Sequence, residues 1–224
     1  EINNLKSQLA DFSGLKRGQI SIICSQALLP YFLPTQIDQF QDKLPDIKFN
    51  INVGDGEKAI SYLRDFKSDL AIIFEPVRSN YIETISTINQ PIQAVMSPEH
   101  PLSKFKSINL ADCLKYPLAL PPSPYAVREI LETAAAEESL DLNPTVEAES
   151  YIFLHNFVSR KKNAISFEVE IDVPKQSLDR SISTVPINLS KSHQGQIHLL
   201  KLQGRAFSGA TEQFIKQLLY VFNN

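Results

Sequence analysis

The sequence has few cysteines, no long apolar run and no signal-peptide pattern. No stretch approaches the roughly 20 apolar residues needed to cross a bilayer. The polar start at 1–6 lacks the charged-then-apolar order of a signal peptide. The two cysteines, Cys24 and Cys113, lie far apart in apolar surroundings, which favours buried reduced thiols over a disulfide or a reactive thiol. These absences predict a cytoplasmic protein without membrane contact.

The sequence also has little excess charge of either sign. Its net charge is −3, and its densest basic cluster is the short run Arg160-Lys161-Lys162. A domain that grips DNA by itself normally presents a basic face. We therefore expect any DNA contact to be made by another segment of the protein.

Familiar catalytic motifs are absent as well. There is no G-x-S-x-G elbow, no Gly-rich P-loop, no H-E-x-x-H pair and no His/Cys cluster at metal-ligand spacing. Gly54-Asp55-Gly56 contains a G-x-G, but without a third glycine it indicates a turn rather than a dinucleotide site. The scattered histidines are interpreted as structural or solvated: His100, His155, His193 and His198. We expect no enzyme activity, no cofactor and no metal.

The sequence does contain a globular composition with strand–helix alternation. Of its 224 residues, 43% are hydrophobic and 21% are charged. Apolar periodicity in the first third predicts strands at 19–24, 47–53 and 69–74 and helices at 27–43 and 57–66. Pro30 is expected in the first turn of the first helix, and Pro34 is expected to kink it. This alternation predicts an α/β fold with a parallel sheet and helices on both faces.

The rest of the chain is predicted to continue with strands and helices, and the strand–helix units suggest two similar lobes. The expected strands are 81–88, 92–97, 117–120, 145–148, 164–167, 182–187 and 197–202, and the expected helices are 110–114, 125–138, 150–160 and 211–222. At the start of the chain, apolar residues at three- and four-residue steps predict an amphipathic helix over 1–12. Its single apolar stripe is typical of the end of a coiled-coil linker, although lone surface helices also carry one.

A candidate ligand site follows from this topology. In open parallel sheets, ligands bind beyond the carboxyl ends of the strands, where helix N-termini present free N–H groups. Four segments place small or polar residues there: Ser25-Gln26, Gly54-Asp55-Gly56, Pro122-Ser123-Pro124 and Glu149-Ser150. The alternative interpretation is that the three serines only cap their own helices. The four segments can share a ligand only if two lobes face each other across a cleft.

The order of several segments resembles the effector-binding domain of LysR-type transcriptional regulators. The matching pieces are GQISI at 18–22, LP at 29–30 and at 33–34, LPDI at 44–47, Gly54, Leu63, SDLAI at 68–72, HPL at 100–102, INLAD at 108–112 and VE at 146–147. Together they read LPDIKF…G…L…SDLAI…HPL…INLADC, and they cover nearly the whole chain.

The resemblance implies two Rossmann-like lobes of the type 2 periplasmic-binding-protein kind, joined by two crossover segments, with a small effector between them. Lobe I would comprise 17–90 plus 195–224, lobe II 91–194, and 1–16 would end a linker helix. It also implies a homodimer or homotetramer and a winged helix-turn-helix, absent from these residues, that reads DNA. A tryptophan at Ser25 is then expected to fill the cleft while the domain still folds.

Two departures from the family pattern concern the effector. The family usually has a V-x-x-G-x-G-I turn, whereas 158–165 reads VSRKKNAI without either glycine. Asn163 is expected to take the left-handed conformation there, and Lys161 to place a cation near the rim. Asp55 and Glu149 put carboxylates where the family often has small hydroxyl residues. A neutral or amine-bearing effector would fit these acids, with Lys161 and Arg128 as counterweights.

Other functions remain open at this stage. A solute-binding protein that serves a membrane transporter would have the same two-lobed fold, and a transferase or deaminase could use it too. The enzyme alternatives lack an evident nucleophile, base or metal set. The apolar positions of the first long helix fit either a homodimer surface or packing on the sheet: Leu28, Leu29, Phe32 and Leu33.

Overall fold

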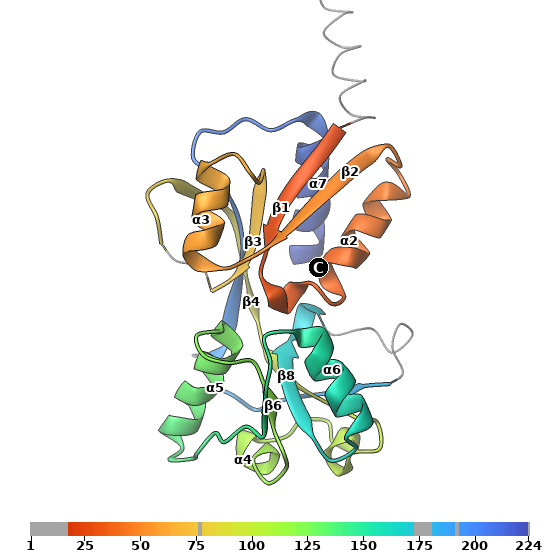
Figure 1. Ribbon diagram of the computed structural model, residues 1–224, viewed down its shortest axis with the longest axis vertical. Coiled ribbons are helices and arrows are strands. Elements are labelled where there is room, and N and C mark those ends of the chain that lie inside the picture. The colour runs from red at the N-terminus through yellow and green to blue at the C-terminus, as the bar shows by residue number, and fades with distance from the viewer. Residues whose placement is uncertain (1–17, 76–77, 173–180, 191–192, 224) are drawn as a thin grey trace, which may run out of the picture. The chain divides into compact units, whose positions relative to one another are not determined.

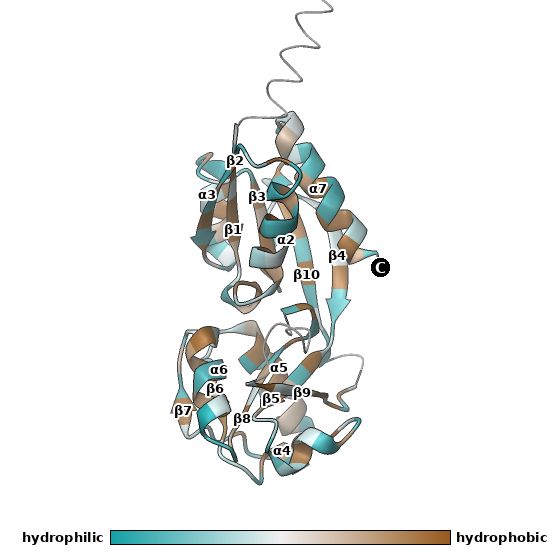
Figure 2. Cartoon of the chain, turned by 90° about the vertical axis from the view of Figure 1, so that its right-hand side faces the viewer, coloured by the Kyte–Doolittle hydropathy of each residue, from teal (hydrophilic) through white to brown (hydrophobic). Residues whose placement is uncertain are grey.

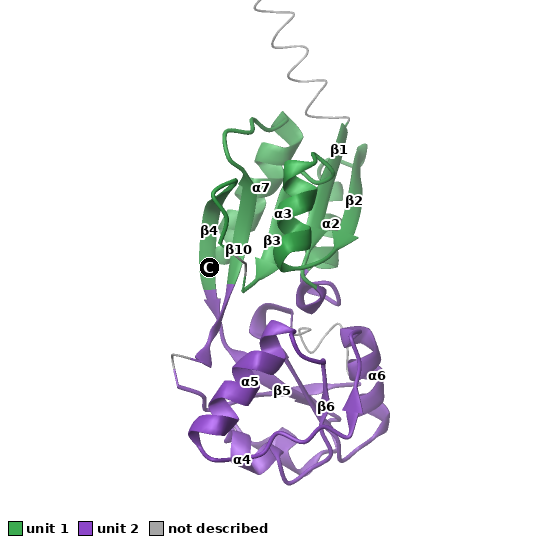
Figure 3. Cartoon of the chain, turned by 60° about the vertical axis from the view of Figure 1, so that its left-hand side comes forward, with its two compact units in different colours: residues 1–25, 33–88, 197–224 green, residues 26–32, 89–196 purple. Residues whose placement is uncertain are grey.

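The computed structural model describes residues 18–75, 78–172, 181–190 and 193–223. Within those limits the chain divides into two compact units (Figure 3). Unit 1 comprises 18–25, 33–88 and 197–223, and unit 2 comprises 26–32 and 89–196. Segment 26–32, which the sequence analysis counts in lobe I, groups with unit 2. The predicted linker helix lies outside the described residues.

Unit 1 is built on a five-stranded sheet with the order β2-β1-β3-β10-β4 (Figure 1). Its strands are β1 (Gly18–Cys24), β2 (Ile47–Val53), β3 (Leu70–Phe74), β4 (Ile82–Gln90) and β10 (Gly195–Leu202). β1 is parallel to both β2 and β3, whereas β10 is antiparallel to β3. The predicted parallel arrangement of the first three strands is confirmed.

Helices cover both faces of this sheet. They are α2 (Phe32–Gln41), α3 (Gly56–Arg64) and α7 (Gly209–Phe222). Ala59 of α3 belongs to the same buried cluster as Ile73 of β3. On the opposite face, the ring of Phe214 on α7 lies 5.2 Å from that of Phe40 on α2 and 5.1 Å from that of Phe49 on β2. Strand side chains alternate between the faces, so the apolar strands serve both layers.

The segment after β1 differs from the single kinked helix that we predicted. A short 3₁₀ turn, η1 (Gln26–Leu28), comes first, and α2 begins only at Phe32. Pro30 therefore lies between the two elements, and Pro34 lies in the first turn of α2, where a missing N–H removes no helical hydrogen bond. Of the four apolar positions considered for a dimer surface, three are buried and Leu29 is partly buried, which favours packing within the chain.

Unit 2 contains two small sheets. The first has the order β8-β5-β9, with both neighbours antiparallel to β5, and the second pairs β6 with β7 in parallel. The strands are β5 (Ile92–Met96), β6 (Ala119–Leu120), β7 (Val146–Glu147), β8 (Ile165–Val169) and β9 (Ser183–Pro186). The helical elements are η2 (Pro101–Lys104), α4 (Leu110–Cys113), α5 (Ala126–Glu137), α6 (Tyr151–Arg160) and η3 (Glu170–Asp172).

Apolar strands form the cores of both units, as the hydropathy colouring indicates for β1 and β3 (Figure 2). All five residues of β3, β5 and β8 are buried. Cys24 and Cys113 are buried thiols that are not joined in a disulfide, as predicted. Over the described ranges, no helix has the length and apolar character required to traverse a bilayer.

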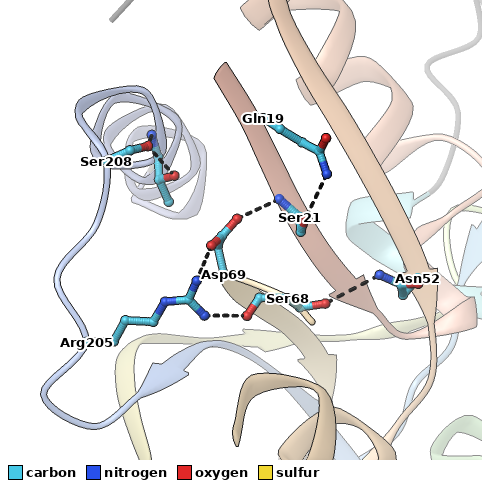
Figure 4. A network of polar contacts seen from close by, with 8 residues as sticks. Gln19, Ser21, Asn52, Ser68, Asp69, Arg205 and Ser208 are labelled. Carbon is cyan, nitrogen blue, oxygen red and sulfur yellow. Dashed lines mark hydrogen bonds and ion pairs between the residues drawn. The ribbon is translucent and has the colours of Figure 1, made fainter. Parts of the chain in front are cut away.

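A polar network fixes the amino end of β3 in unit 1 (Figure 4). The Asp69 carboxylate accepts a hydrogen bond from the Ser21 N–H at 2.8 Å and forms an ion pair with Arg205. Arg205 also donates to the carbonyl oxygen of Ser68 at 2.8 Å, and its guanidinium lies 5.1 Å from the centre of the Phe66 ring. The network joins β1, β3 and the segment before α7, and it leaves the carboxyl ends of the strands free for the candidate site.

Candidate functional site

The candidate site in unit 1 lies at the carboxyl ends of three neighbouring parallel strands. β1, β2 and β3 end at Cys24, Val53 and Phe74. The loops that follow are held against the strand ends by backbone hydrogen bonds, from Ser25 N–H to the Ile72 oxygen at 3.0 Å and from Gly54 N–H to the Cys24 oxygen at 3.1 Å. The sheet thus brings two of the four predicted segments together, at the edge where open α/β sheets bind ligands.

Ser25 connects all three strand ends through its hydroxyl group. The side chain accepts a hydrogen bond from the Phe74 N–H at 2.8 Å and donates a short one to Asp55. It does not cap η1, so the capping interpretation is wrong for this serine. Only 2% of Ser25 is exposed, and a tryptophan there would have to displace packed atoms. The burial of Ser25 therefore leads us to expect that Ser25→Trp destabilises the fold, and the folding of this variant stays a prediction.

Asp55 is the N-cap residue of α3, but its side chain bonds Ser25 instead of the helix. Asp55 as a residue is exposed, yet the atoms around its carboxylate withhold water and raise its pKa, an effect that the Ser25 hydrogen bond and the Lys58 charge oppose. Gly56 begins the helix at φ 50°, which favours glycine. A Cβ on Gly54 would lie 2.6 Å from Cδ of Lys58, so a larger residue there would require the Lys58 side chain to move.

Glu75 is a residue of this edge that the sequence analysis missed. It directly follows β3 and has a φ of 55°, in the left-handed region that a non-glycine residue rarely adopts. Such conformations concentrate at functional sites. No sequence signal singled it out, because the sequence analysis expected no helix directly after the strand at 69–74.

The corresponding edge in unit 2 lies after β6 and β7. The Ala148 N–H donates to the Leu120 oxygen at 3.1 Å and so extends this strand pair. Ser123 is exposed, precedes a cis peptide bond to Pro124, and does not cap α5, whose N-cap residue is Tyr125. The capping interpretation is wrong for Ser123. It is confirmed for Ser150, whose hydroxyl accepts the Phe153 N–H of α6 at 3.3 Å.

Arg128 in unit 2 forms ion pairs with carboxylates other than Asp55 and Glu149, which it was expected to balance. Only 8% of it is exposed. Its guanidinium lies 2.6 Å from the Glu132 carboxylate and 2.7 Å from the Glu147 carboxylate. Glu149 itself is exposed. Because both ion pairs use Arg128, it offers little free positive charge to a ligand.

The turn after α6 differs from its prediction. Lys161 is the exposed C-cap residue of α6, and the neighbouring Lys162 pairs with Glu99 at 2.6 Å. Asn163 is exposed but does not have a positive φ, so the left-handed conformation expected for it is wrong. Asn163 therefore does not supply the left-handed backbone conformation that a glycine adopts easily.

Unit 2 also contains a buried cluster of titratable side chains that the sequence analysis did not identify. Glu168 and Asp172 are 0% exposed, and His155 Nε2 lies 2.5 Å from the Glu168 carboxylate. Burial raises the pKa of Glu168 to about 8, and burial with the adjacent Glu168 raises the pKa of Asp172 well above its usual range. Asp172 accepts the N–H groups of Tyr31 at 3.0 Å and Phe32 at 2.5 Å.

This cluster holds the start of α2 and is closed to solvent. The His155 ring also stacks on Tyr31, with centroids 5.7 Å apart. A substrate could not reach the cluster without a rearrangement, so its geometry favours a structural role over acid–base chemistry. The chain carried no motif that pointed to it, because its members come from the start of α2 and from α6, β8 and η3.

The other histidines lie in separate places. His100 accepts the Leu102 N–H at 3.1 Å, His193 lies 3.0 Å from Glu137, and His198 lies 3.1 Å from the Thr87 hydroxyl. Across the described segments, no set of three or more His, Cys, Asp or Glu side chains is placed to hold a metal ion.

The predicted site residues thus form groups in each unit. Unit 1 holds Ser25, Gly54, Asp55 and Gly56, whereas unit 2 holds Gln26, Ser123, Glu149, Ser150 and Asn163. Ser25 and Asp55 are in direct contact, and Gly54 and Gly56 flank Asp55 in the chain. Their roles as ligand contacts stay a prediction.

Two α/β units with polar groups beyond parallel strand ends define a module of the type 2 periplasmic-binding-protein class. The sequence profile described as the LysR substrate binding domain matches residues 13–223. The chain belongs to this family.

Individual relatives are distant. The chain is 26% identical over 149 residues to the HTH-type transcriptional activator CmpR of Synechocystis sp., which covers 66% of this chain and 49% of that protein. The effector binding domain of QuiR in complex with shikimate matches with a TM-score of 0.69 at 23% identity, over 92% of this chain and 98% of that one. The Synechocystis PCC6803 CcmR regulatory domain in complex with 2-PG matches with a TM-score of 0.73 at 17% identity, over 93% of this chain and 99% of that one. The chain spans about half the length of the curated relatives that it matches first.

Proposed function

We propose that this chain is the effector-sensing part of a transcription regulator and binds a small molecule without transforming it. The observation that carries the proposal is the contact of Ser25 with Asp55 and Phe74, which assembles polar groups beyond three parallel strands. Family membership and the ligands named for QuiR and CcmR support the same function.

The proposed contacts are drawn from both units. In unit 1 they are Ser25, Gly54, Asp55 and Gly56, and in unit 2 they are Gln26, Ser123, Glu149, Ser150 and Asn163. Ser25 and Asp55 present oxygen atoms, whereas Gly54 and Gly56 allow a ligand to approach the backbone closely. Ser123 and Glu149 are exposed, and their side chains remain accessible to a ligand.

Regulation would follow from a shift between conformations that bind the effector with different affinities. By thermodynamic linkage, the effector and the DNA then change each other's affinity by the same factor, typically worth about 1–3 kcal/mol. In this proposal the protein acts in the cytoplasm as a homodimer or homotetramer. DNA is read by sequence outside these residues, in keeping with the relatives named as HTH-type regulators.

The proposal is tested by a thermal-shift screen of the chain against a metabolite library, followed by mass spectrometry of each hit. A ligand present at 100 times its Kd stabilises the fold by about 2.7 kcal/mol, which corresponds to a rise in Tm of roughly 5–10 °C for a chain of this size. The ligand should be recovered unchanged. The proposal would be refuted by conversion of the ligand, or by hits whose binding neither Asp55→Asn nor Ser123→Ala weakens.

A further inference from the structure

At the carboxyl edge of the unit 1 sheet, the Ser25 hydroxyl can only accept a hydrogen bond from a ligand, and Lys58 already donates one of its three hydrogens within the chain. The Ser25 hydroxyl has one hydrogen, which it donates to Asp55, while its oxygen accepts the Phe74 N–H at 2.8 Å. The ammonium group of Lys58 donates to the Val53 oxygen at 2.6 Å. A ligand that meets Ser25 and Asp55 in this arrangement finds a hydroxyl lone pair and a carboxylate.

The charges in the loops at this edge include more acids than bases. Asp55 and Glu57 lie at the start of α3 and Glu75 directly follows β3, whereas the described cations of these loops are Lys58 and the exposed Arg78. The free N–H groups of the first turn of α3 favour an anion. The carboxylates of Asp55 and Glu57 already place negative charge beside that turn, so a second anion gains little there.

Of the two cations expected to balance a ligand in unit 2, Lys161 is exposed, whereas Arg128 is engaged elsewhere. Arg128 is bound by Glu132 at 2.6 Å and Glu147 at 2.7 Å. A ligand carboxylate would have to displace one of them. The described contacts therefore favour a ligand that brings its own hydrogen-bond donors.

We propose that the effector carries a protonated amino group, which donates hydrogen bonds to the Asp55 carboxylate and to the Ser25 hydroxyl oxygen in unit 1. This inference rests on the proposed function, and it adds the chemical class of the effector and makes Asp55 the residue that selects it. Desolvation raises the pKa of Asp55, which means that its charge lacks full compensation in the chain. A bound ammonium group would supply that compensation.

The test uses isosteric probes that differ in charge. Butylamine, butyramide and butyrate form one set; benzylamine, benzamide and benzoate form a second; shikimate is added as a further carboxylate. Each probe is titrated at millimolar concentration into the isotope-labelled chain, and the backbone amide signals of Ser25 and 54–56 are followed by NMR. Asp55→Asn keeps the size and capping ability of the residue but removes its charge. Asp38→Asn, on the exposed surface of α2, is the matched control.

The amines should shift these amide signals saturably and should bind more tightly than the amides and the carboxylates. Asp55→Asn should weaken amine binding by roughly ten- to a hundredfold, the size expected for a hydrogen bond to a charged group, and Asp38→Asn should change it less than threefold. Carboxylates that bind at these amides as tightly as amines, or amine binding that survives Asp55→Asn, would overturn the inference but leave the proposed function standing. If no probe of any class shifts signals in either unit, both fail.

Discussion

The stability of the protein should fall as the pH rises from 5 to 8, because unit 2 buries a carboxyl group that prefers to be protonated. The pKa of Glu168 is about 8 in the folded chain against an ordinary value of 4.5. Between these values the folded state holds a proton that the unfolded state has released. The stabilisation is therefore complete below the unfolded pKa and is lost as the pH rises through the folded pKa.

The magnitude follows from the size of the shift. One pKa unit corresponds to about 1.4 kcal/mol, so a displacement from 4.5 to about 8 is worth on the order of 4–5 kcal/mol. The pKa of Asp172 is raised by the same burial and by its proximity to Glu168. The two carboxyl groups therefore titrate as a pair and shift stability in the same direction. This is a large part of the 5–15 kcal/mol that stabilises a typical domain.

The assay is urea unfolding followed by circular dichroism at pH 5, 6, 7 and 8, on the parent chain, Glu168→Gln and the exposed-site control Glu138→Gln. The lowered pKa values of His100 and His198 act in the opposite direction below about pH 6.5. The difference between parent and variant removes their contribution and reports on the buried cluster of Glu168 with Asp172 and His155. The parent and Glu138→Gln should lose about 4 kcal/mol more than Glu168→Gln over this interval. Equal pH profiles for Glu168→Gln and the parent would refute the reasoning.

Three further substitutions or treatments test other parts of the structure. Ser25→Ala leaves the Phe74 N–H without its acceptor and should lower the free energy of unfolding by about 1–3 kcal/mol; a change below 0.3 kcal/mol in urea unfolding would contradict the contact. Arg205→Ala leaves the partly buried Asp69 carboxylate without its ion pair and should cost roughly 1–3 kcal/mol, whereas Arg205→Lys should cost less. Cys113 should resist alkylation by iodoacetamide at pH 8 in the folded chain, because burial raises its thiol pKa to about 12; labelling at the rate of the urea-unfolded chain would contradict this.

The elements of the fold that depend on local patterns were predictable from the sequence. The continuous apolar run at 69–74 predicted β3, which is fully buried, and the alternation at 47–53 predicted β2 with the same bounds. The first long helix was predicted too early in the chain. The apolar residues from Leu28 to Leu33 were assigned to a single helix, but they occupy a 3₁₀ turn, a loop and the start of α2. Because apolar residues on both sides of the break are buried, the apolar spacing continues across it and resembles that of one helix.

The contacts within the site were less predictable, because they depend on residues brought together by the fold. The strand-end rule correctly placed Ser25 and Asp55 at one edge, but it did not predict that Ser25 would bond Asp55 instead of capping η1. The ion pair of Arg128 with Glu132 has the i,i+4 spacing of a helix pair within α5, but its pair with Glu147 reaches β7, and no local pattern indicated that contact. The acids at 168 and 172 were overlooked for a related reason. Charged residues are rarely fully buried, so a charged position in sequence gives little reason to expect a place in the core.

The chain passes from unit 1 to unit 2 between two consecutive residues of the candidate site. Ser25 is fixed in unit 1 by Phe74 and Asp55, whereas the segment that begins at Gln26 is fixed in unit 2, where Asp172 holds its far end at Tyr31. A ligand that changes the hydrogen bonds of Ser25 therefore acts on the residue next to this crossing. Hinges are formed by a few residues at the ends of elements that absorb changes in φ and ψ. If the proposed effector contacts Ser25, that contact lies next to the backbone that joins the units, and it can bias one conformation over another.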